Sequence, residues 1–329
     1  MKRKILIIHK GGKVHTWCED LLAGFLETGC QADVAALRSH RLEERRMQRK
    51  TGLRHFENPA AVQRIAGQIR QIRPDLIVLL NYATLPDEAS ARIRDAAGVR
   101  TPVISWLADH ITRFPDKTSP NLDGVYYFDS ATLPLLEEHY AGTPARLEFL
   151  PLAANPARFP DYGLPWASRK RGLVFIGNNT PSRRAIIREL QGLGTAVSPF
   201  GPRAEAGLKF WRRRKISPAV SSGVYGAYQG VLNMLQPPNT IHGLNLRAFE
   251  VPASGGLGTY PLTPDLVKSF VPGEEIIAYT GIEDLHGRLE SVFSNPARAA
   301  ALIQAGRARL LKDHTYAMRA RRLLNDWLA

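Results

Sequence analysis

Short runs of consecutive apolar residues, separated by amphipathic stretches, recur along this chain and constrain its fold more than any other feature. Lys4–His9 (KILIIH) and residues 75–80 (DLIVLL) are the clearest runs, and residues 59–73 between them carry apolar side chains at helical spacings of three and four. A strand that is apolar without alternation is buried on both faces, which is typical of parallel sheets covered by helices. The pattern therefore predicts an α/β protein with doubly wound parallel sheets.

The same alternation predicts the remaining elements and a division of the chain. Further strands are expected at residues 32–37, 102–107, 124–128, 172–176, 231–235, 256–260 and 275–279, and helices at 86–97, 132–140, 182–193, 284–294 and 296–313. Residues 150–166 hold four prolines and no periodicity, which is typical of a linker. We expect an N-terminal domain at residues 1–150, a hinge at 151–166 and a C-terminal domain at 167–329. Two such domains enclose a cleft, and ligands bind at the carboxyl ends of the strands.

The chain contains no apolar stretch near the roughly 18–20 residues that a membrane-spanning helix needs. The first apolar run is too short for a signal peptide, so we expect a cytoplasmic protein. The two cysteines, Cys18 and Cys30, are too few for a disulfide framework or a four-cysteine zinc site, and we expect both in the core.

The charge is strongly basic, with 44 Lys and Arg against 30 Asp and Glu among 329 residues, a formal net charge of +14. Such a surplus attracts nucleic acid, an acidic membrane face or a phosphorylated small molecule. The basic clusters at residues 41–50, 169–171, 212–215 and 319–322 are scattered, and no helix-turn-helix, zinc-finger or RNP motif accompanies them. Specific nucleic-acid binding is therefore not expected. Solvated helix faces, peripheral contact with the inner membrane and an anionic substrate remain open.

The turn after the predicted strand 172–176 has features of a phosphate site. Gly177 allows close approach to the backbone, and Asn178 follows it. Ser182 is placed to cap the next helix, whose N-terminus favours an anion, and Arg183 adds charge. Many turns between strands and helices contain Gly and Asn, so an ordinary connection is the alternative.

A denser constellation lies at residues 242–258. Asn245, Arg247 and Glu250 are polar side chains at helical spacing among apolar ones, followed by a Gly-Gly pair and a predicted strand. A carboxylate there can accept both hydroxyls of a ribose, and an arginine can bind a diphosphate as a fork. The alternative is a surface helix with one ordinary ion pair.

The segment reads N-x-R-x-F-E-x-x-A-x-G-G from Asn245 to Gly256, and residues 265–276 then supply D-L-x-x-x-F-x-P-G-x-E-I. These motifs resemble the nucleotide-sugar-binding core of GT-B glycosyltransferases, in particular the "glycosyl transferases group 1"-like family that includes the CgeB-type spore-maturation proteins. The resemblance is strong over residues 150–324 and faint before them. It implies a GT-B architecture of two Rossmann-like domains and a hexosyltransferase-like, metal-independent enzyme of polysaccharide biosynthesis. The donor would be a nucleotide-sugar, which is a substrate, and no cofactor is expected.

Carried over by position, the resemblance makes Glu250 the ribose carboxylate and Asn245 and Arg247 contacts of the diphosphate or the sugar. Gly177 and Asn178 become the loop near the phosphates. Many retaining GT-B enzymes have a glutamate eight residues before the ribose glutamate, whereas this chain has His242, which we count among the donor-binding residues. Retention or inversion at the anomeric carbon therefore stays open.

Catalytic groups are expected from the N-terminal domain, which binds the acceptor in this family. Asp109 and His110 follow a buried strand, and Asp109 is the candidate general base for an acceptor hydroxyl, with His110 as its partner. The alternative for Asp109 is a residue that only starts a turn. Gly11, Gly12 and Asn81 also follow predicted strands and are expected to line the cleft.

The acceptor is a hydroxyl compound whose identity the sequence leaves open between a glycan, a lipid-linked glycan and a protein. The nine histidines show no metal-binding spacing, so no metal site is expected. Two other functions remain open: a sugar-nucleotide 2-epimerase of the same fold, and a non-catalytic protein that binds nucleotide-sugars or polyanions.

Overall fold

The computed structural model describes residues 2–10, 14–37, 55–114, 118–178, 180–200, 216–235 and 239–329. The chain divides into two compact units. The first unit comprises Met1–Pro151 and Tyr316–Ala329, and the second unit comprises Leu152–Thr315. The sequence-based division assigned residues 316–329 to the C-terminal domain, whereas the structure groups them with the first unit.

The first unit is built on a parallel sheet. Its strands are β1 (Lys4–His9), β2 (Gln31–Ala36), β3 (Leu76–Leu80), β5 (Val103–Trp106), β7 (Gly124–Tyr127) and β8 (Arg146–Phe149), and a separate antiparallel pair joins β4 (Leu85–Pro86) to β6 (Thr118–Ser119). Its helices are α1 (Val14–Glu27), α3 (Pro59–Ile72), α4 (Asp87–Ala97), α5 (Leu133–His139) and α12 (Tyr316–Leu328), with 3-10 turns η1 (His55–Glu57) and η2 (Ser130–Thr132). Within the described residues the sheet has six strands in the order β2-β1-β3-β5-β7-β8.

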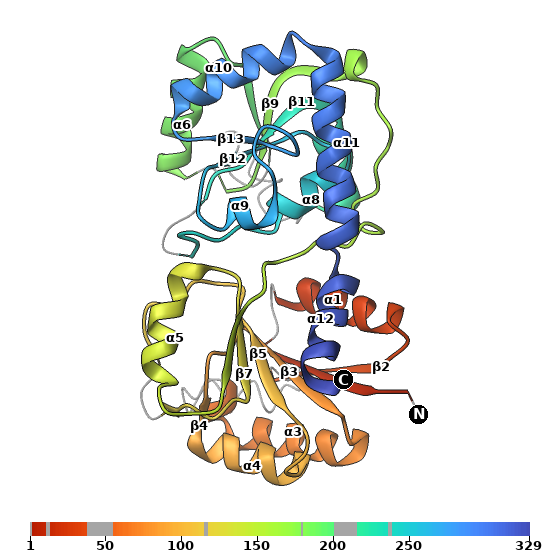
Figure 1. Cartoon of the computed structure of the whole chain (residues 1–329), viewed down its shortest axis with the longest axis vertical. Helices are drawn as coiled ribbons and strands as arrows, with labels where there is room; N and C mark the ends of the chain where they lie inside the picture. The colour runs from red at the N-terminus through yellow and green to blue at the C-terminus, as the bar shows by residue number, and fades with distance from the viewer. Residues whose placement is uncertain are drawn as a thin grey trace. The chain divides into compact units, whose positions relative to one another are not determined.

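Helices cover both faces of this sheet, with α3 and α4 on one side and α1 and α12 on the other (Figure 1). Leu6 and Ile8 of β1 belong to the core cluster that includes α3 and α4 residues, and the pleat turns the intervening Ile5 and Ile7 to the opposite face. On that opposite face Trp106 packs edge-on against Trp17 of α1, with ring centroids 5.1 Å apart. The continuous apolar runs of the sequence reflect this burial from both sides.

Helix α12 is fixed to the first unit by polar bonds as well as by packing. The Tyr126 hydroxyl donates to Asp326 at 2.7 Å, and the Trp327 indole donates to the same hydroxyl at 2.8 Å. Arg319 donates to the Pro151 carbonyl at 2.7 Å. These bonds join residues far apart in sequence. The periodicity of the sequence carries no sign of them, so α12 was assigned to the C-terminal domain that it follows in the chain.

The second unit repeats the parallel architecture. Its strands are β9 (Lys170–Ile176), β10 (Val197–Phe200), β11 (Tyr228–Leu232), β12 (Gly258–Pro261) and β13 (Ile277–Tyr279). Its helices are α6 (Pro181–Gly192), α7 (Pro218–Ala227), α8 (Arg247–Ala253), α9 (Leu266–Ser269), α10 (Ile282–Phe293) and α11 (Pro296–Asp313), with the 3-10 turn η3 (Trp166–Ser168). Within the described residues the sheet has five strands in the order β10-β9-β11-β12-β13.

Both sheets reverse their strand order at one point, as doubly wound Rossmann-like folds do. In chain order the first five strands of each sheet are arranged 2-1-3-4-5, so the reversal lies between β1 and β3 in the first unit and between β9 and β11 in the second. The predicted α/β class and doubly wound topology are therefore confirmed. Crevices at such reversal points, outside the carboxyl ends of the strands, are where ligands bind in this class of fold.

Strands β8 and β10 and helix α7 were not predicted from the sequence. The two strands lie at sheet edges, and their residues are exposed or half-buried except Val197. Both cysteines are buried free thiols, as expected. In the described part of the chain no helix has the length and apolarity needed to cross a membrane.

Candidate functional site

The reversal point of the second unit is bridged by one side chain, that of Arg247. One guanidinium nitrogen, Nη1, donates to the side-chain oxygen of Asn233 at 2.9 Å, and the other, Nη2, donates to the backbone carbonyl of Ile176. Ile176 ends β9 and Asn233 directly follows β11, so the arginine joins the carboxyl ends of the two strands between which the order reverses. Residue 247 is the first residue of α8.

Asn233 is the residue of this site that sequence reasoning missed. Its side chain is fully buried, and its oxygen also accepts from the Asn245 amide at 2.9 Å. Asn233 could have been predicted as a polar residue at the end of a buried strand. The same criterion singled out Asn81 in the first unit. Among the described residues, three buried atoms of this network have no hydrogen-bond partner: Asn233 Nδ2, Asn245 Oδ1 and Arg247 Nε.

Two guanidinium groups share the ring of Phe175. Arg183 lies 5.4 Å and Arg247 5.5 Å from the ring centroid. Arg183 is 9 % exposed, and burial, followed by the charge of Arg247, lowers the pKa of its guanidinium. Its hydrogen bonds go to the carbonyls of Asn178 at 3.1 Å and Met234 at 3.4 Å. Among the residues that the structure describes, no carboxylate forms an ion pair with either arginine, and the charge that acts on Arg183 is that of Arg247.

The turn between β9 and α6 lies beside these arginines. A Cβ on Gly177 would stand 2.9 Å from the Phe175 ring and 3.3 Å from Nη2 of Arg247, so the close approach requires glycine. Asn178 is exposed, and its carbonyl is held by Arg183. Thr180, and not Ser182 as expected, caps α6: its hydroxyl accepts the Arg183 amide at 3.5 Å, because the chain enters the helix at Pro181.

Glu250 lies one turn after Arg247 on α8 and is half-buried. Burial first, and then the negative charge of Glu250, raise the pKa of the Tyr225 hydroxyl, while Arg247 opposes this rise. Burial also raises the pKa of Tyr260; Tyr225 and Glu250 add to this rise, and Arg247 opposes it. Glu250 and Arg247 therefore act electrostatically on the same two buried tyrosines. His242 is half-buried in the irregular segment before α8.

In the first unit, Asn81 and Asp109 come together at the carboxyl ends of β3 and β5. The Asn81 amide donates to Asp109 Oδ2 at 2.8 Å, and its side-chain oxygen accepts the Ala108 backbone amide at 3.1 Å. Asn81 has a φ of 67°, a left-handed conformation that asparagine tolerates better than most residues. The carboxylate of Asp109 is exposed.

His110 has a different partner from the one expected. Its Nδ1 lies 2.9 Å from the Thr132 hydroxyl, and Thr132 is 1 % exposed. A hydrogen bond from Asn81 therefore orients the Asp109 carboxylate, and a separate hydrogen bond with Thr132 orients the His110 ring. Gly11 and Gly12, predicted to line the cleft, lie outside the described residues.

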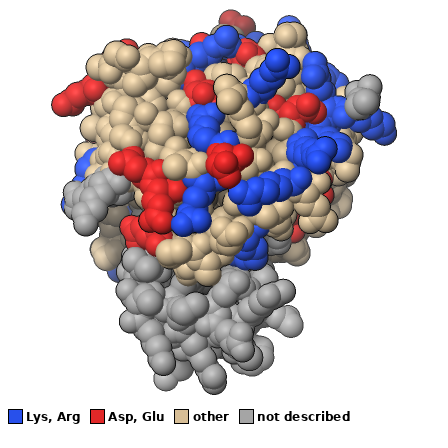
Figure 2. Space-filling view, turned by 90° about the horizontal axis from the view of Figure 1, so that it is seen from below, with Lys and Arg blue, Asp and Glu red and all other residues tan. Residues whose placement is uncertain are grey.

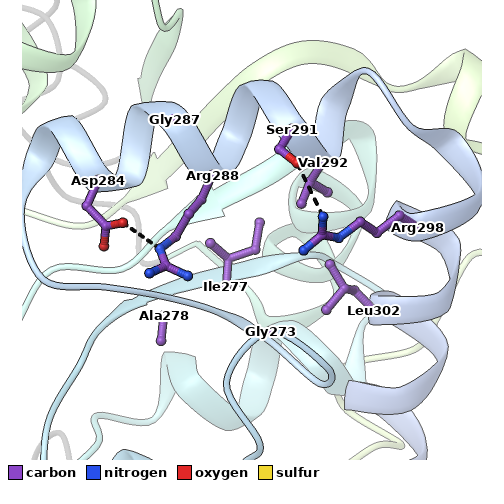
Figure 3. A pocket seen from close by; sticks show the side chains of 10 residues that line it. All are labelled: Gly273, Ile277, Ala278, Asp284, Gly287, Arg288, Ser291, Val292, Arg298 and Leu302. Carbon is purple, nitrogen blue, oxygen red and sulfur yellow. Dashed lines mark hydrogen bonds and ion pairs between the residues drawn. The ribbon is translucent and has the colours of Figure 1, made fainter.

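A cavity of about 290 Å³ lies elsewhere in the second unit, between β13, α10 and α11 (Figure 3). Its floor is apolar, with Ile277 and Leu302, and Arg288 and Arg298 reach over it. Arg288 is paired with Asp284 at 2.7 Å, and Arg298 donates to the Ser291 hydroxyl at 3.2 Å. None of the residues predicted for a site lines this cavity, and it lies away from the strand ends where the order reverses, so we place the candidate site at Arg247.

The basic surplus does not form a continuous field on the face seen in Figure 2, where basic and acidic side chains are intermixed over the described residues. Ion pairs on α3 and α4 show the same mixing, with Arg70 bonded to Asp95 at 2.8 Å and Arg92 to Glu88 at 3.4 Å. The clusters at residues 41–50 and 212–215 lie outside the described residues. Membrane contact through basic faces therefore stays a prediction.

No group of three or more His, Cys, Asp or Glu side chains is arranged to hold a metal ion in the part of the chain that the structure describes. Several motif residues that follow the site are instead structural. Phe270 is fully buried and packs against Phe249 and His314, with ring centroids 5.8 and 5.1 Å away. Phe270 of the second motif therefore packs against Phe249 of α8 and helps to hold that helix in place.

Comparisons with known proteins bear on the fold and on the second half of the chain. Residues 183–325 match the family model described as glycosyl transferase-like. A solved glycosyltransferase from Rickettsia africae ESF-5 is 13% identical, with 99% of this chain and 98% of that chain covered and a TM-score of 0.70. HepE from Anabaena, solved in complex with UDP-glucose, is 10% identical, with 98% and 99% covered and a TM-score of 0.65. Sucrose-phosphate synthase from Thermosynechococcus elongatus is 12% identical, with 99% of both chains covered and a TM-score of 0.59.

No curated protein matches the sequence significantly. The structure has the GT-B fold, with two Rossmann-like units, and the predicted resemblance to glycosyltransferases of this fold is confirmed over residues 183–325. The narrower CgeB-type assignment stays a prediction.

Proposed function

We propose that the chain is a glycosyltransferase that takes a sugar from a nucleoside-diphosphate donor and transfers it to a hydroxyl acceptor. The observation that carries the proposal is the pair of guanidiniums, Arg183 and Arg247, that share the Phe175 ring at the strand reversal of the second unit. A diphosphate is the anion that such a pair of positive charges attracts, and partial burial strengthens that attraction. UDP-sugars are the first donors to test because HepE has been solved with UDP-glucose.

In the proposed reaction the acceptor oxygen attacks the anomeric carbon, and the bond from that carbon to the diphosphate oxygen breaks. Negative charge then develops on the leaving nucleoside diphosphate. Arg183 and Arg247 would stabilise that charge without reorganising, since protein carbonyls and Asn233 already fix both side chains. Glu250 would accept the ribose hydroxyls from its position beside Arg247 on α8. Transfer of this kind needs no metal if the arginines stabilise the leaving group.

Asp109 is the proposed base that takes the proton of the acceptor hydroxyl. Asn81 donates to one carboxylate oxygen, Oδ2, which leaves Oδ1 to accept the proton. A base in this role belongs to a single displacement that inverts the anomeric carbon. In a retaining transfer the same carboxylate would only position the sugar.

The test is a calorimetric and thermal-shift screen of UDP, GDP, ADP and dTDP, and of the corresponding sugar nucleotides, on the wild type and on Glu250→Ala. We expect one nucleotide to stabilise the wild type by mass action and to bind Glu250→Ala about tenfold or more weakly, as for loss of a charged acceptor. Glu290→Ala, a change of an exposed glutamate on α10, is the matched control and keeps wild-type affinity. Binding of none of these ligands to the wild type would refute the proposed function.

A further inference from the structure

The side chain of Asn233 connects the candidate donor site to the sheet beneath it. Its oxygen accepts two hydrogen bonds at 2.9 Å, one from Arg247 Nη1 and one from Asn245 Nδ2. Arginine can only donate, so the atom of Asn233 that faces it is the oxygen, and Asn245 must turn its NH₂ group toward the same atom. One acceptor thereby orients two of the residues that the sequence motif singled out.

Asn233 is itself held rigidly. It is fully buried, and its backbone carbonyl accepts the Tyr279 hydroxyl of β13 at 2.9 Å. Arg247 links Asn233 to the next strand, because its Nη2 donates to the backbone carbonyl of Ile176, the residue directly before Gly177. The chain of bonds runs from β11 through Asn233 and Arg247 to the turn that follows β9.

The bonding also fixes Arg247 in place. Each of its terminal nitrogens donates one N–H to a protein oxygen. Each terminal nitrogen also carries a second N–H, so the guanidinium is held in position while it keeps donors besides these two bonds. Loss of the fully buried Asn233 oxygen would take the acceptor from two half-buried donors at once, which costs more than the loss of one surface hydrogen bond.

We propose that Asn233 is a positioning residue for the nucleoside-diphosphate site, and that it acts through Arg247 to fix the Ile176–Gly177 turn and the start of α8. The inference rests on the proposed function, since it assigns the purpose of the network to donor binding. A purely structural asparagine would stabilise the sheet without a specific effect on nucleotide affinity.

The test is a double-mutant cycle on the full chain with Asn233→Leu, Arg247→Met and the double variant. The probe is whichever of UDP, GDP, ADP and dTDP binds the wild type most tightly, and the readout is its dissociation constant. We expect Asn233→Leu to weaken binding about tenfold or more in the wild type but less than about threefold in the Arg247→Met background, because coupled residues are not additive. Equal factors in the two backgrounds, or unchanged affinity of Asn233→Leu, would overturn the proposal.

A matched control separates positioning from stability. Thr259 on β12 is also fully buried, and its hydroxyl donates to the Val231 carbonyl of β11 at 3.2 Å. Thr259→Val removes this bond without touching Arg247, so it should lower the unfolding temperature and leave nucleotide affinity within about twofold. If Asn233→Leu does not unfold cooperatively, Asn233→Ala removes the same acceptor and replaces it in the cycle. Failure of every nucleotide to bind the wild type would refute the proposed function, whereas binding without coupling would refute only the role of Asn233.

Discussion

Asn81 donates its side-chain amide to Asp109 at 2.8 Å from a backbone with a φ of 67°. Its side-chain oxygen accepts from Ala108, so one amide group holds both the carboxylate and the chain that carries it. A left-handed conformation is costly for most residues other than glycine, and such positions cluster at functional sites. Asn81 was predicted to line the cleft, and the structure gives it a specific contact with the predicted base.

Asn81→Asp tests whether Asp109 is the base. A second carboxylate next to Asp109 disfavours ionisation of the pair, so the pKa for loss of its last proton rises. We expect the acidic limb of the pH–activity profile to move upward by about one unit or more. Asn81→Gly tolerates the backbone conformation and adds no charge, so the acidic limb of the pH–activity profile of this variant should move less. An acidic limb of Asn81→Asp that coincides with the wild type would contradict the assignment of Asp109.

Arg183→Met tests the positive charge at the second-unit site. Arg183 is buried against Phe175 and its guanidinium donates to the carbonyls of Asn178 and Met234, and its removal takes one positive charge from the proposed diphosphate site. We expect nucleoside-diphosphate binding to weaken by about 1.5–3 kcal/mol in calorimetry. Arg188→Met changes the same charge at an exposed position of the same helix and should keep wild-type affinity within about twofold. Equal losses in the two variants would indicate a general charge effect instead of a site.

Two helical glycines should respond in opposite directions to alanine. A Cβ on Gly306 of α11 would stand 2.3 Å from the Glu275 carbonyl oxygen, whereas a Cβ on Gly287 of α10 would meet nothing within 4 Å. Gly306→Ala forces the helix away from the backbone beneath it and should lower the free energy of unfolding by about 1–3 kcal/mol. Gly287→Ala should raise it by about 0.5–1 kcal/mol through helix propensity. Chemical denaturation measures both, and a stabilised Gly306→Ala would show that α11 does not pack this closely.

His139 gives the fold a pH dependence with a definite sign. Its ring stacks on Phe114, with centroids 3.6 Å apart, and its buried Nε2 has no hydrogen-bond partner in the part of the chain that the structure describes. Burial lowers the pKa of the ring below the ordinary 6.5. The folded state therefore binds fewer protons than the unfolded state, so this group costs stability as the pH falls below about 6.5. His139→Phe keeps the stacking and removes the titration, and the loss of unfolding temperature between pH 7.5 and 5.5 should become smaller. If the unfolding temperature of His139→Phe falls as much as that of the wild type between these pH values, His139 is not the source of the pH dependence.

Chelation tests the predicted independence from metal. Once an active donor and acceptor pair is known, EDTA should leave the initial rate unchanged, because the arginines of the second unit are proposed to stabilise the leaving group. A reproducible loss of activity that a divalent cation restores would contradict this prediction.

Periodicity predicted the buried strands well and the edge strands poorly. β1 was predicted with the bounds observed, because its residues are packed on both faces and appear as one apolar run. β8 and β10 lie at sheet edges, where polar residues such as Glu148 and Ser198 interrupt the apolar pattern. The absence of a continuous run is a consequence of half-exposure, so no strand was predicted there.

The parallel α/β architecture and the Asn245, Arg247 and Glu250 constellation could be predicted from the sequence, because both depend on spacing along a single strand or helix. Which side chains meet depends on the folded chain. Asn233 reaches Arg247, and Asn81 reaches Asp109, because strand order places distant chain segments at one sheet edge. Local periodicity encodes burial and secondary structure, whereas a hydrogen bond between two strand ends depends on the order and register in which the sheet assembles.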